Sequence, residues 1–504
     1  MTSPARDALE ALVAQFSERS AFVRELVQNS LDAGAGRVEL NVVQEKRRMV
    51  IDVTDDGEGM DREVIETHLL TLFSSSKEKD LTKIGKFGIG FVSLFALKPE
   101  LVVVDTARDG VHHRVIFDAD WSYTLAELDE PFEGTRVRLY VRTWGKKGEA
   151  LAGELRQAIH YWCKHARAEI WTVGQGKGWS WDEEVVGTWD VDAILKIEVE
   201  SPGFRAVLGP WPEKVTPVAY VNRGLTLLEG REDTVPGVTF RIEAAQLEHT
   251  LTRDNVLRDA GFEEVVEHLR QLARGPLTNK LTEEIRASVA AQDNERIEAL
   301  VRAGQHLPIP EDLAWIPLAN GGYARMEDFE PSSWVMFGEQ PLWYAPGPSA
   351  LVRALGEEGS QVLSGAPDSM AASRLCARWS GLVPKPVAEA WIKPQLGPEP
   401  RLAAAMRRVA KTNPMVGREL ICARFAEGGS RLQGRLAILQ REPGQLQQEL
   451  DDDGVLVINV DHPHFKRAAA LPADIGGSVL LVAALRAVGD NVRLTSGVLL
   501  DLLS

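Results

Sequence analysis

Apolar positions near the start of the chain follow first a helical period and then a strand period. From residue 22 onward, apolar or small side chains recur at helical spacing and predict one buried helix face, made by Phe22, Val23, Leu26, Val27, Ser30 and Leu31. Gly34 and Gly36 are expected to end this helix. Two stretches of alternating apolar residues follow at 38–42 and 51–53, with a polar turn between them, and they predict a β-hairpin.

Three polar side chains share another face of the predicted helix. Glu25, Asn29 and Asp32 stand at positions i, i+4 and i+7, so their oxygen atoms are expected on one side. Taken alone, such a face is typical of a helix surface in water.

Two glycine-rich segments follow the predicted hairpin. The first, Asp55-Asp56-Gly57-Glu58-Gly59-Met60, comes directly after the second strand, and alone it is typical of a tight turn. The second runs from Lys83 to Phe91, follows Ser74-Ser75-Ser76-Lys77 and opens an apolar helix. A glycine-rich helix start favours anions, because free backbone N–H groups and the helix dipole attract negative charge there.

The order and spacing of these motifs narrow the interpretation. E-x-x-x-N-x-x-D-A is followed about thirty residues later by D-x-G-x-G, and about thirty further on by G-x-x-G-x-G. This arrangement resembles the Bergerat-fold ATP-binding domain of the GHKL ATPases: gyrase, heat-shock protein 90, histidine kinases and MutL. The block I-G-K-F-G-I-G-F-V-S-L-F-A-L looks most similar to heat-shock protein 90 and its bacterial HtpG form. The resemblance implies an α+β first domain, with helices on one face of a mainly antiparallel sheet.

The resemblance also implies a role for each matching residue. Asn29 would hold the Mg²⁺ ion that bridges the phosphates of ATP, and Glu25 would orient and deprotonate the attacking water. A hard cation accepts a neutral amide oxygen, whereas a general base has to be an unliganded carboxylate. Asp55 would accept a hydrogen bond from the adenine amino group, and Asp56 is disfavoured because only Asp55 has glycines at the family's offsets.

The remaining matched positions would surround the nucleotide. Gly57 and Gly59 would let adenine approach closely, Met60 would flank it, and Asp32 and Ala33 complete the helix motif. Backbone N–H groups of the glycine block would bind phosphates at Gly85, Gly88, Gly90 and Phe91. Phe132-Glu133-Gly134-Thr135 resembles the family's G-T box and implies that Thr135 lies near the adenine.

One segment departs from the chaperones. The stretch from Ser74 to Ile84 is much shorter than their nucleotide lid, and Leu72-Phe73 stand where those proteins have a nucleotide-contacting lysine. Lys77 is the candidate substitute, since S-S-S-K resembles the start of the MutL lid, although an exposed lysine in a polar loop is the alternative.

We expect three domains from a chain of 504 residues. Further strands at 101–104, 113–117 and 137–141, a helix at 148–166 and a strand at 169–173 complete an ATP-binding domain at 1–175. A smaller α/β middle domain, transducer-like with a helical extension from 262 to 303, is expected at 180–305. The region 306–504 is expected to be mixed α/β and of unknown role.

The middle region supplies one further candidate. A-Y-V-N-R-G at 219–224, followed by L-T-R-D-N-V, resembles the middle segment of heat-shock protein 90, whose loop arginine reaches the γ-phosphate. By position this residue is Arg253, and a permanently charged, forked guanidinium suits a phosphate. Thr252-Arg253-Asp254 is equally an ordinary helix start with a surface arginine.

Composition limits the partners. The net charge is −16, which opposes non-specific nucleic-acid binding because such binding neutralises phosphates with Lys and Arg. Three scattered cysteines indicate neither a disulfide framework nor a zinc site. Without a long apolar run or a signal-like start, we expect a cytoplasmic protein with no membrane segment.

The last third of the chain contains few motifs that resemble those of this family. A hairpin is expected at 315–323, a buried strand at 455–460 and helices at 477–488 and 495–503. Those helices would form either a homodimer contact, as in related chaperones, or a domain core. Asp461-His462-Pro463-His464 reads as a turn rather than a metal site.

Two functions remain in competition. The leading prediction is a slow ATPase that works as a conformational machine of the heat-shock protein 90 chaperone kind on protein clients, with ATP and Mg²⁺ as cofactors. The alternative is a GHKL ATPase clamp in a DNA repair or defence assembly, MutL-like or MORC-like, which the short lid favours and the acidic charge opposes. A sensor histidine kinase is disfavoured because Glu25 lies too near the N-terminus for a phospho-accepting hairpin to precede it.

Overall fold

The structure is a computed structural model of the chain. It describes residues 13, 19–70, 90–143, 145–250, 255–330, 340–357, 359–379, 381–387, 401–412, 420–425, 435–440 and 455–487. The chain forms two compact units, residues 1–280 with 303–307, and residues 281–302 with 308–504.

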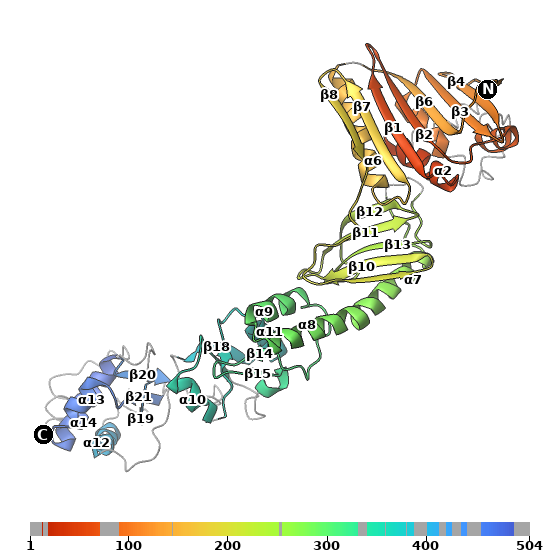
Figure 1. Ribbon diagram of the computed structural model, residues 1–504. Coiled ribbons are helices and arrows are strands. Elements are labelled where there is room, and N and C mark those ends of the chain that lie inside the picture. Colours follow the sequence, from red (N-terminus) through yellow and green to blue (C-terminus); the bar gives the residue numbers. More distant parts are fainter. Residues whose placement is uncertain are drawn as a thin grey trace. The chain divides into compact units, whose positions relative to one another are not determined.

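An eight-stranded sheet forms the first layer of the first unit (Figure 1). Its strands are β1 (Arg37–Gln44), β2 (Arg48–Asp55), β3 (Leu101–Arg108), β4 (Val111–Asp118), β5 (Tyr123–Leu128), β6 (Gly134–Arg142), β7 (Glu169–Gly176) and β8 (Trp179–Glu184). Their order is β5-β4-β3-β6-β2-β1-β7-β8. All neighbours are antiparallel except β1 and β7, which run parallel.

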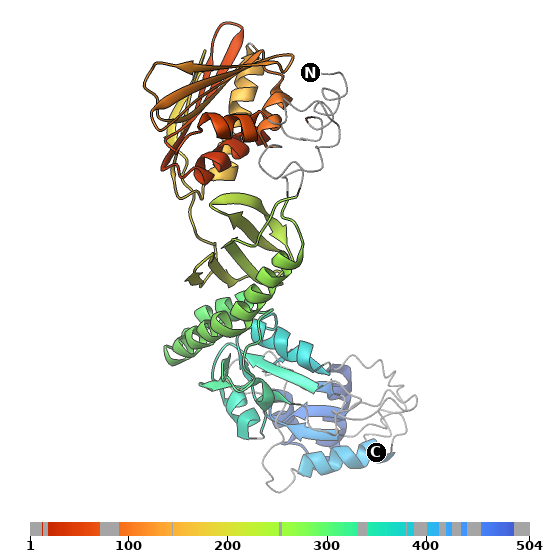
Figure 2. The same ribbon diagram turned by 90° about the vertical axis from the view of Figure 1, so that its right-hand side faces the viewer.

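Helices cover one face of this sheet and bury its core (Figure 2). They are α2 (Ala21–Asp32), α3 (Arg62–Val64), η1 (Ile65–Leu69), η3 (Ser93–Leu97) and α6 (Lys146–Cys163). The apolar stripe of α2 is buried as its period predicts, and Phe22 and Val27 are fully enclosed against strand residues such as Leu40 and Ile51. The α+β class and the mainly antiparallel sheet are therefore confirmed.

Two strands of this sheet were not expected. The first, β5, carries the mostly exposed sequence Tyr-Thr-Leu-Ala-Glu-Leu and lacks an apolar alternation strong enough to identify it. The second, β8, pairs with β7 across the glycine- and tryptophan-rich segment that was expected to be a domain boundary at residue 175. The sheet thus continues past that position to Glu184, because Trp179 and Trp181 pack over glycines of β7 and stack on each other with ring centroids 5.0 Å apart.

A second, five-stranded sheet follows within the first unit. It consists of β9 (Ile197–Ser201), β10 (Phe204–Pro210), β11 (Thr216–Asn222), β12 (Leu225–Glu232) and β13 (Val238–Ala244), in the order β12-β11-β13-β10-β9. β11 and β13 run parallel and the other neighbours antiparallel. The expected middle domain therefore has its own sheet, in which β10 and β12 add to the strands that the sequence indicated.

The helical extension is present but interrupted. It comprises α7 (Ala260–Leu272), η4 (Ala273–Leu277), α8 (Thr278–Ala290) and α9 (Asn294–Ala303). Asp259 caps α7 by accepting from the Phe262 N–H at 3.0 Å. Gln292, at a φ of 58°, breaks the expected continuous helix between α8 and α9.

The described residues of the second unit form one two-stranded sheet and two three-stranded sheets, which with their helices make two groups. The first group holds β14 (Ile316–Pro317), β15 (Tyr323–Ala324), η5 (Met326–Phe329), β16 (Gln340–Ala345), α10 (Ala350–Glu357), β17 (Leu363–Ser364), α11 (Met370–Arg378) and β18 (Leu382–Pro386). The second holds α12 (Arg401–Thr412), β19 (Leu420–Ala423), β20 (Ala437–Gln440), β21 (Val455–Asn459), α13 (Pro463–Ala468) and α14 (Ala473–Ala487). The hairpin expected at 315–323 is β14 with β15, and the expected buried strand is β21.

The histidines near residue 462 have a structural position. His462 precedes α13, and its Nδ1 accepts from the His464 N–H at 3.1 Å, so it acts as a helix cap. Over the described ranges, no group of three or more His, Cys, Asp or Glu side chains is arranged to hold a metal ion. No helix in those ranges is long and apolar enough to cross a bilayer.

Candidate functional site

A pocket of about 410 Å³ opens between α2 and the sheet of the first domain. The lining side chains with polar groups include Asn29, Asp32, Asp55 and Thr135. Its apolar walls come from Leu26, Val53, Met60, Val64, Leu69, Phe91, Val104 and Val137. Residues that the sequence analysis selected from separate motifs therefore converge on one cavity.

Asp55 lies at the end of β2 and is held there by three donors. Its Oδ1 accepts from the backbone N–H of Gly57 at 3.0 Å and of Thr135 at 3.2 Å. Its Oδ2 lies 2.7 Å from the hydroxyl of Ser30 on α2. Because an ionised carboxylate has about four acceptor positions, one remains for a ligand in the pocket.

Burial raises the pKa of Asp55 above its ordinary value of 3.8. The hydrogen bonds from Ser30, Gly57 and Thr135 act in the opposite direction, because they stabilise the charged form, but burial is the larger effect. The three donors around Asp55 indicate its acceptor role, and in a partly desolvated cavity a hydrogen bond from a ligand is stronger than in water.

Asp56 has a different function in the fold. Its Oδ1 accepts from the backbone N–H groups of Gly36 and Arg37, at 2.8 Å each, and so fixes the turn between α2 and β1. Unlike Asp55, it does not line the pocket.

Thr106 connects two walls of the pocket. Its Oγ1 accepts from the Met60 N–H at 2.8 Å and lies 3.0 Å from Oγ1 of Thr135. Neither Thr106 nor Ser30 was predicted from the sequence as a site residue. In each case the only available signal was a polar residue within an apolar pattern, namely Ser30 in the buried stripe of α2 and Thr106 in β3.

Gly59 is required by the fold itself. It has a φ of +67°, and a Cβ atom there would lie 2.0 Å from the carbonyl oxygen of Ala107. Gly134 has a φ of +71°, and a Cβ atom there would lie 2.0 Å from the carbonyl oxygen of Asp55. Both glycines let the backbone pack closely around the pocket, which explains their presence without reference to a ligand.

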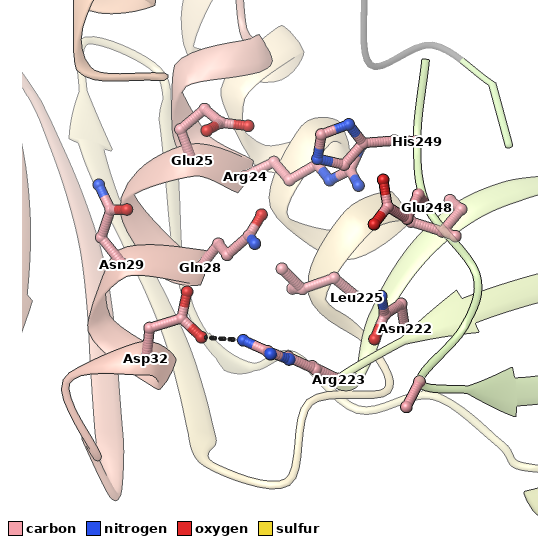
Figure 3. A pocket seen from close by; sticks show the side chains of 12 residues that line it. Arg24, Glu25, Gln28, Asn29, Asp32, Asn222, Arg223, Leu225, Glu248 and His249 are labelled. Carbon is pink, nitrogen blue, oxygen red and sulfur yellow. Dashed lines mark hydrogen bonds and ion pairs between the residues drawn. The ribbon is translucent and has the colours of Figure 1, made fainter. Parts of the chain in front are cut away.

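A second pocket, of about 210 Å³, lies between α2 and the second sheet (Figure 3). Glu25, Asn29 and Asp32 line it from α2, and Asn222, Arg223, Leu225, Glu248 and His249 line it from the second sheet and the segment that follows it. Asn29 and Asp32 line both pockets, whereas Glu25 lines only this one. The α2 face predicted from the sequence therefore contributes residues to two cavities.

The charged groups of α2 are unusually buried. Glu25 is 4% exposed and Arg24 is 2% exposed. Burial lowers the pKa of Arg24 to about 10, and its guanidinium stacks over the Trp162 ring at 5.0 Å. Glu25 is thus enclosed, whereas Asn29 and Asp32, further along the same polar face, are exposed.

Ion pairs join the helices of the first domain to the second sheet within the first unit. Arg223, in the turn after β11, pairs with Asp32 at 2.7 Å (Figure 3). Glu229 on β12 accepts from Lys164 just after α6, and also from Arg241 on β13 at 3.3 Å. Arg241 in turn contacts His165, whose pKa is lowered to about 4 by burial and by the nearby positive charge of Arg241.

Several predicted site residues lie outside the described part of the chain. They are Lys77, Gly85, Gly88 and Arg253, together with the whole shortened lid from 74 to 84. Gly90 and Phe91 are described, and Phe91 lines the first pocket with its ring 5.6 Å from that of Phe117. Ala33, Gly59 and Met60 also line this pocket, and Gly57 adjoins it through its bond to Asp55.

The fold and the cavity define an ATPase domain of the GHKL class. Residues 17–127 match the family described as histidine kinase-, DNA gyrase B- and HSP90-like ATPase. The first domain of the chain belongs to this family, and the prediction made from its motifs is confirmed.

Chaperones are among the relatives of this domain. The chain is 30% identical over 197 residues to the chaperone protein HtpG of Nitrosospira multiformis, covering 33% of this chain and 30% of that protein. It is 27% identical over 214 residues to the chaperone protein HtpG of Aromatoleum aromaticum, covering 36% and 33%. The matched region thus spans about a third of each relative.

Proposed function

We propose that this protein binds and hydrolyses ATP and uses the cycle to change the arrangement of its domains, as a chaperone of the heat-shock protein 90 kind acting on protein clients. The observation that carries the proposal is the position of Asp55. It is a buried acceptor in an apolar pocket, with three of its acceptor positions filled by the protein and one left. An adenine amino group is the donor that this position fits.

The proposed roles divide between the two sides of α2. Asp55, Met60 and Thr135 hold the base in the first pocket, and Asn29, which lines both pockets, holds Mg²⁺ beside the phosphates. Glu25, in the second pocket, is the general base for the attacking water. A carboxylate in a cavity is suited to this task because it can accept a proton from a water held in the same cavity.

The magnesium ion would depend mostly on ligands from the nucleotide. The described residues hold no cluster of three acidic or imidazole side chains. Asn29 would hold the cation through its amide oxygen, and phosphate oxygens and water would supply the other ligands, as is common for Mg²⁺. This requirement makes metal binding dependent on the nucleotide.

The ion pair between Asp32 and Arg223 supports a coupling between ATP hydrolysis and the arrangement of the domains. Asp32 lines the nucleotide pocket, and Arg223 belongs to the second sheet. His249 lines the second pocket and precedes Arg253 by four positions in the sequence. We propose that Arg253 meets the γ-phosphate when the middle domain docks, because a permanent charge supplied by another domain makes hydrolysis depend on docking.

The remaining proposals rest on the family resemblance. They are a homodimeric assembly, a cytoplasmic location and slow turnover limited by domain motion. The similarity to two HtpG chaperones over part of the chain supports the chaperone proposal. A clamp in a DNA repair or defence assembly is the second candidate, favoured by the short stretch between 74 and 84.

Replacing Glu25 tests the hydrolytic part of the proposal. Glu25→Ala should still bind ATP, because Glu25 does not line the base pocket, but should lose nearly all ATP cleavage. Calorimetry and phosphate release measure the two properties separately. Glu154→Ala, at an exposed position of α6, is the matched control and should leave both unchanged. Undiminished cleavage by Glu25→Ala would overturn the assignment of the base.

A further inference from the structure

A row of polar residues crosses four adjacent strands of the first sheet. Asp55 on β2 pairs in register with Thr135 on β6, Thr135 with Thr106 on β3, and Thr106 with His113 on β4. Directly paired residues on neighbouring strands project to the same face of a sheet. Because Asp55 and Thr135 line the first pocket, the whole row lies on the pocket side.

Thr106 has no exposed surface and does not line the pocket. Its neighbours along β3 are mostly apolar, so valine would suit the position if packing alone mattered. A buried hydroxyl is costly unless it is hydrogen-bonded. The Thr106 hydroxyl forms hydrogen bonds with two residues, Met60 and Thr135, and both of them line the pocket.

The hydrogen-bond donors along this row depend on where the proton of the Thr106 hydroxyl points. The Thr106 oxygen accepts from the Met60 N–H, and it carries one proton of its own. Within the described part of the chain, the acceptor in range of that proton is Thr135 Oγ1, at 3.0 Å. His113, the other neighbour of Thr106 in the row, is 4% exposed, and its Nδ1 has no hydrogen-bond partner among the described residues. It therefore does not take up the Thr106 proton. Either hydroxyl can be the donor in this contact; we assign Thr106 as the donor because its proton then has a partner, and this leaves the Thr135 proton for the ligand.

We propose that Thr106 is a positioning residue that makes this site selective for adenine over 6-oxopurines. With Thr106 donating to it, Thr135 presents a donor, while Asp55 presents an acceptor. Adenine carries the complementary pair, an N6 amino donor beside the N1 acceptor. Guanine and hypoxanthine carry the inverse pair, an O6 acceptor beside an N1–H donor. Their acceptor would face the acceptor Asp55, and their donor would face the donor Thr135.

This inference rests on the proposed function, since it concerns how the same site recognises the base of its nucleotide. The test compares ATP with inosine triphosphate, which differs from ATP only at the edge that Asp55 and Thr135 would contact. Thr106→Val removes the hydroxyl and keeps the shape, whereas Thr106→Ser keeps the hydroxyl. Dissociation constants are measured by calorimetry on the full chain, with thermal unfolding recorded for each variant.

Thr106→Val should weaken ATP binding by about tenfold, the size expected for one lost hydrogen bond in a buried site. Its affinity for inosine triphosphate should change much less, so the preference for ATP falls, and Thr106→Ser should restore that preference. Thr226→Val is the matched control, because Thr226 is fully buried in the second sheet and its hydroxyl has no partner in the described residues. It should leave both affinities unchanged.

The double variant distinguishes positioning from direct contact. If Thr106 acts through Thr135, Thr106→Val should cost little further affinity in a Thr135→Val background. Should Thr106→Val fail to fold, Thr135→Val alone must still lower the preference for ATP over inosine triphosphate, and an unchanged preference would overturn the proposal.

An unchanged preference in a folded Thr106→Val protein would overturn it equally. If the parent chain bound neither nucleotide, the proposed function itself would fail. If the parent bound ATP, Asp55→Asn did not and Thr106→Val bound as the parent does, only the inference about Thr106 would fail.

Discussion

At the scale of single residues, the site combines side chains that the sequence identifies with others that only the register brings together. Asp55 could be predicted because its glycines stand at fixed offsets along the chain. Ser30 and Thr106 could not, because their contacts with Asp55 and Thr135 join residues 25 and 29 positions apart. Such pairs depend on how α2 packs on the sheet and how β3 pairs with β6, which no local pattern specifies.

The raised pKa of Asp55 predicts that nucleotide binding is sensitive to acid. As the pH falls through a pKa above the ordinary 3.8, the carboxyl becomes a donor where the adenine amino group needs an acceptor. Affinity for adenosine, which has no phosphate to titrate, should therefore fall on mild acidification. Calorimetric titrations at successive pH values measure it, and an affinity that stays constant until the protein unfolds would contradict the role of Asp55.

The same protonation affects stability in the opposite direction. Because the pKa of Asp55 is higher in the folded than in the unfolded chain, the folded state binds more protons between the two values. The contribution of Asp55 to the free energy of unfolding thus becomes more favourable as the pH falls. Weaker binding in acid would consequently not be a result of a weaker fold at this residue.

At the scale of elements, the strongly periodic helices and strands were predictable and the weakly patterned edges were not. The helix at α6 and the strand at β7 follow from apolar spacing, whereas β5 is mostly exposed and β8 is rich in charge and tryptophan. The glycines at 174 and 176 looked like a linker from composition alone. In the fold they make room for the rings of Trp181 and Trp179 across the hairpin.

The junction after α6 predicts a second dependence on pH. His165 is surrounded by Arg241, Lys164, Arg205 and Glu229, and its pKa is lowered from 6.5 to about 4, first by burial and then by Arg241. Since the unfolded chain takes up a proton that the folded chain resists, the His165 contribution to the free energy of unfolding is present above the ordinary pKa. It is lost progressively as the pH falls from 6.5 toward about 4.

Denaturant unfolding of the parent and of His165→Gln measures this effect. The parent should lose free energy of unfolding more steeply than the variant across that pH range, because glutamine does not titrate. Parallel curves for the two proteins would show that His165 is not held neutral at the junction.

At the scale of the whole molecule, the sequence separated an ATP-binding region from later regions but assigned no function to the last third. That limit has a physical basis. The second unit is built from short strands and helices whose apolar residues serve its own small cores, and over its described residues it holds no three-ligand metal cluster. Packing residues of this kind specify a fold without specifying a ligand.

The net charge of −16 bears on the choice between a chaperone and a DNA clamp. If the protein acts on protein clients, duplex DNA at about physiological salt should neither bind measurably nor raise the rate of ATP hydrolysis. Phosphate release with and without DNA, over a series of salt concentrations, measures the effect. Several-fold stimulation that disappears as salt rises would favour the DNA repair or defence assembly instead.

The most direct test of the account is a calorimetric ATP titration of the full chain and of Asp55→Asn. The substitution nearly preserves the size of the side chain but lets it present an NH₂ donor where adenine requires an acceptor. We expect the parent to bind ATP and Asp55→Asn to show no measurable binding. The thermal unfolding of Asp55→Asn should stay close to that of the parent. Binding of ATP by Asp55→Asn with the affinity of the parent would contradict the assignment of this pocket as the adenine site.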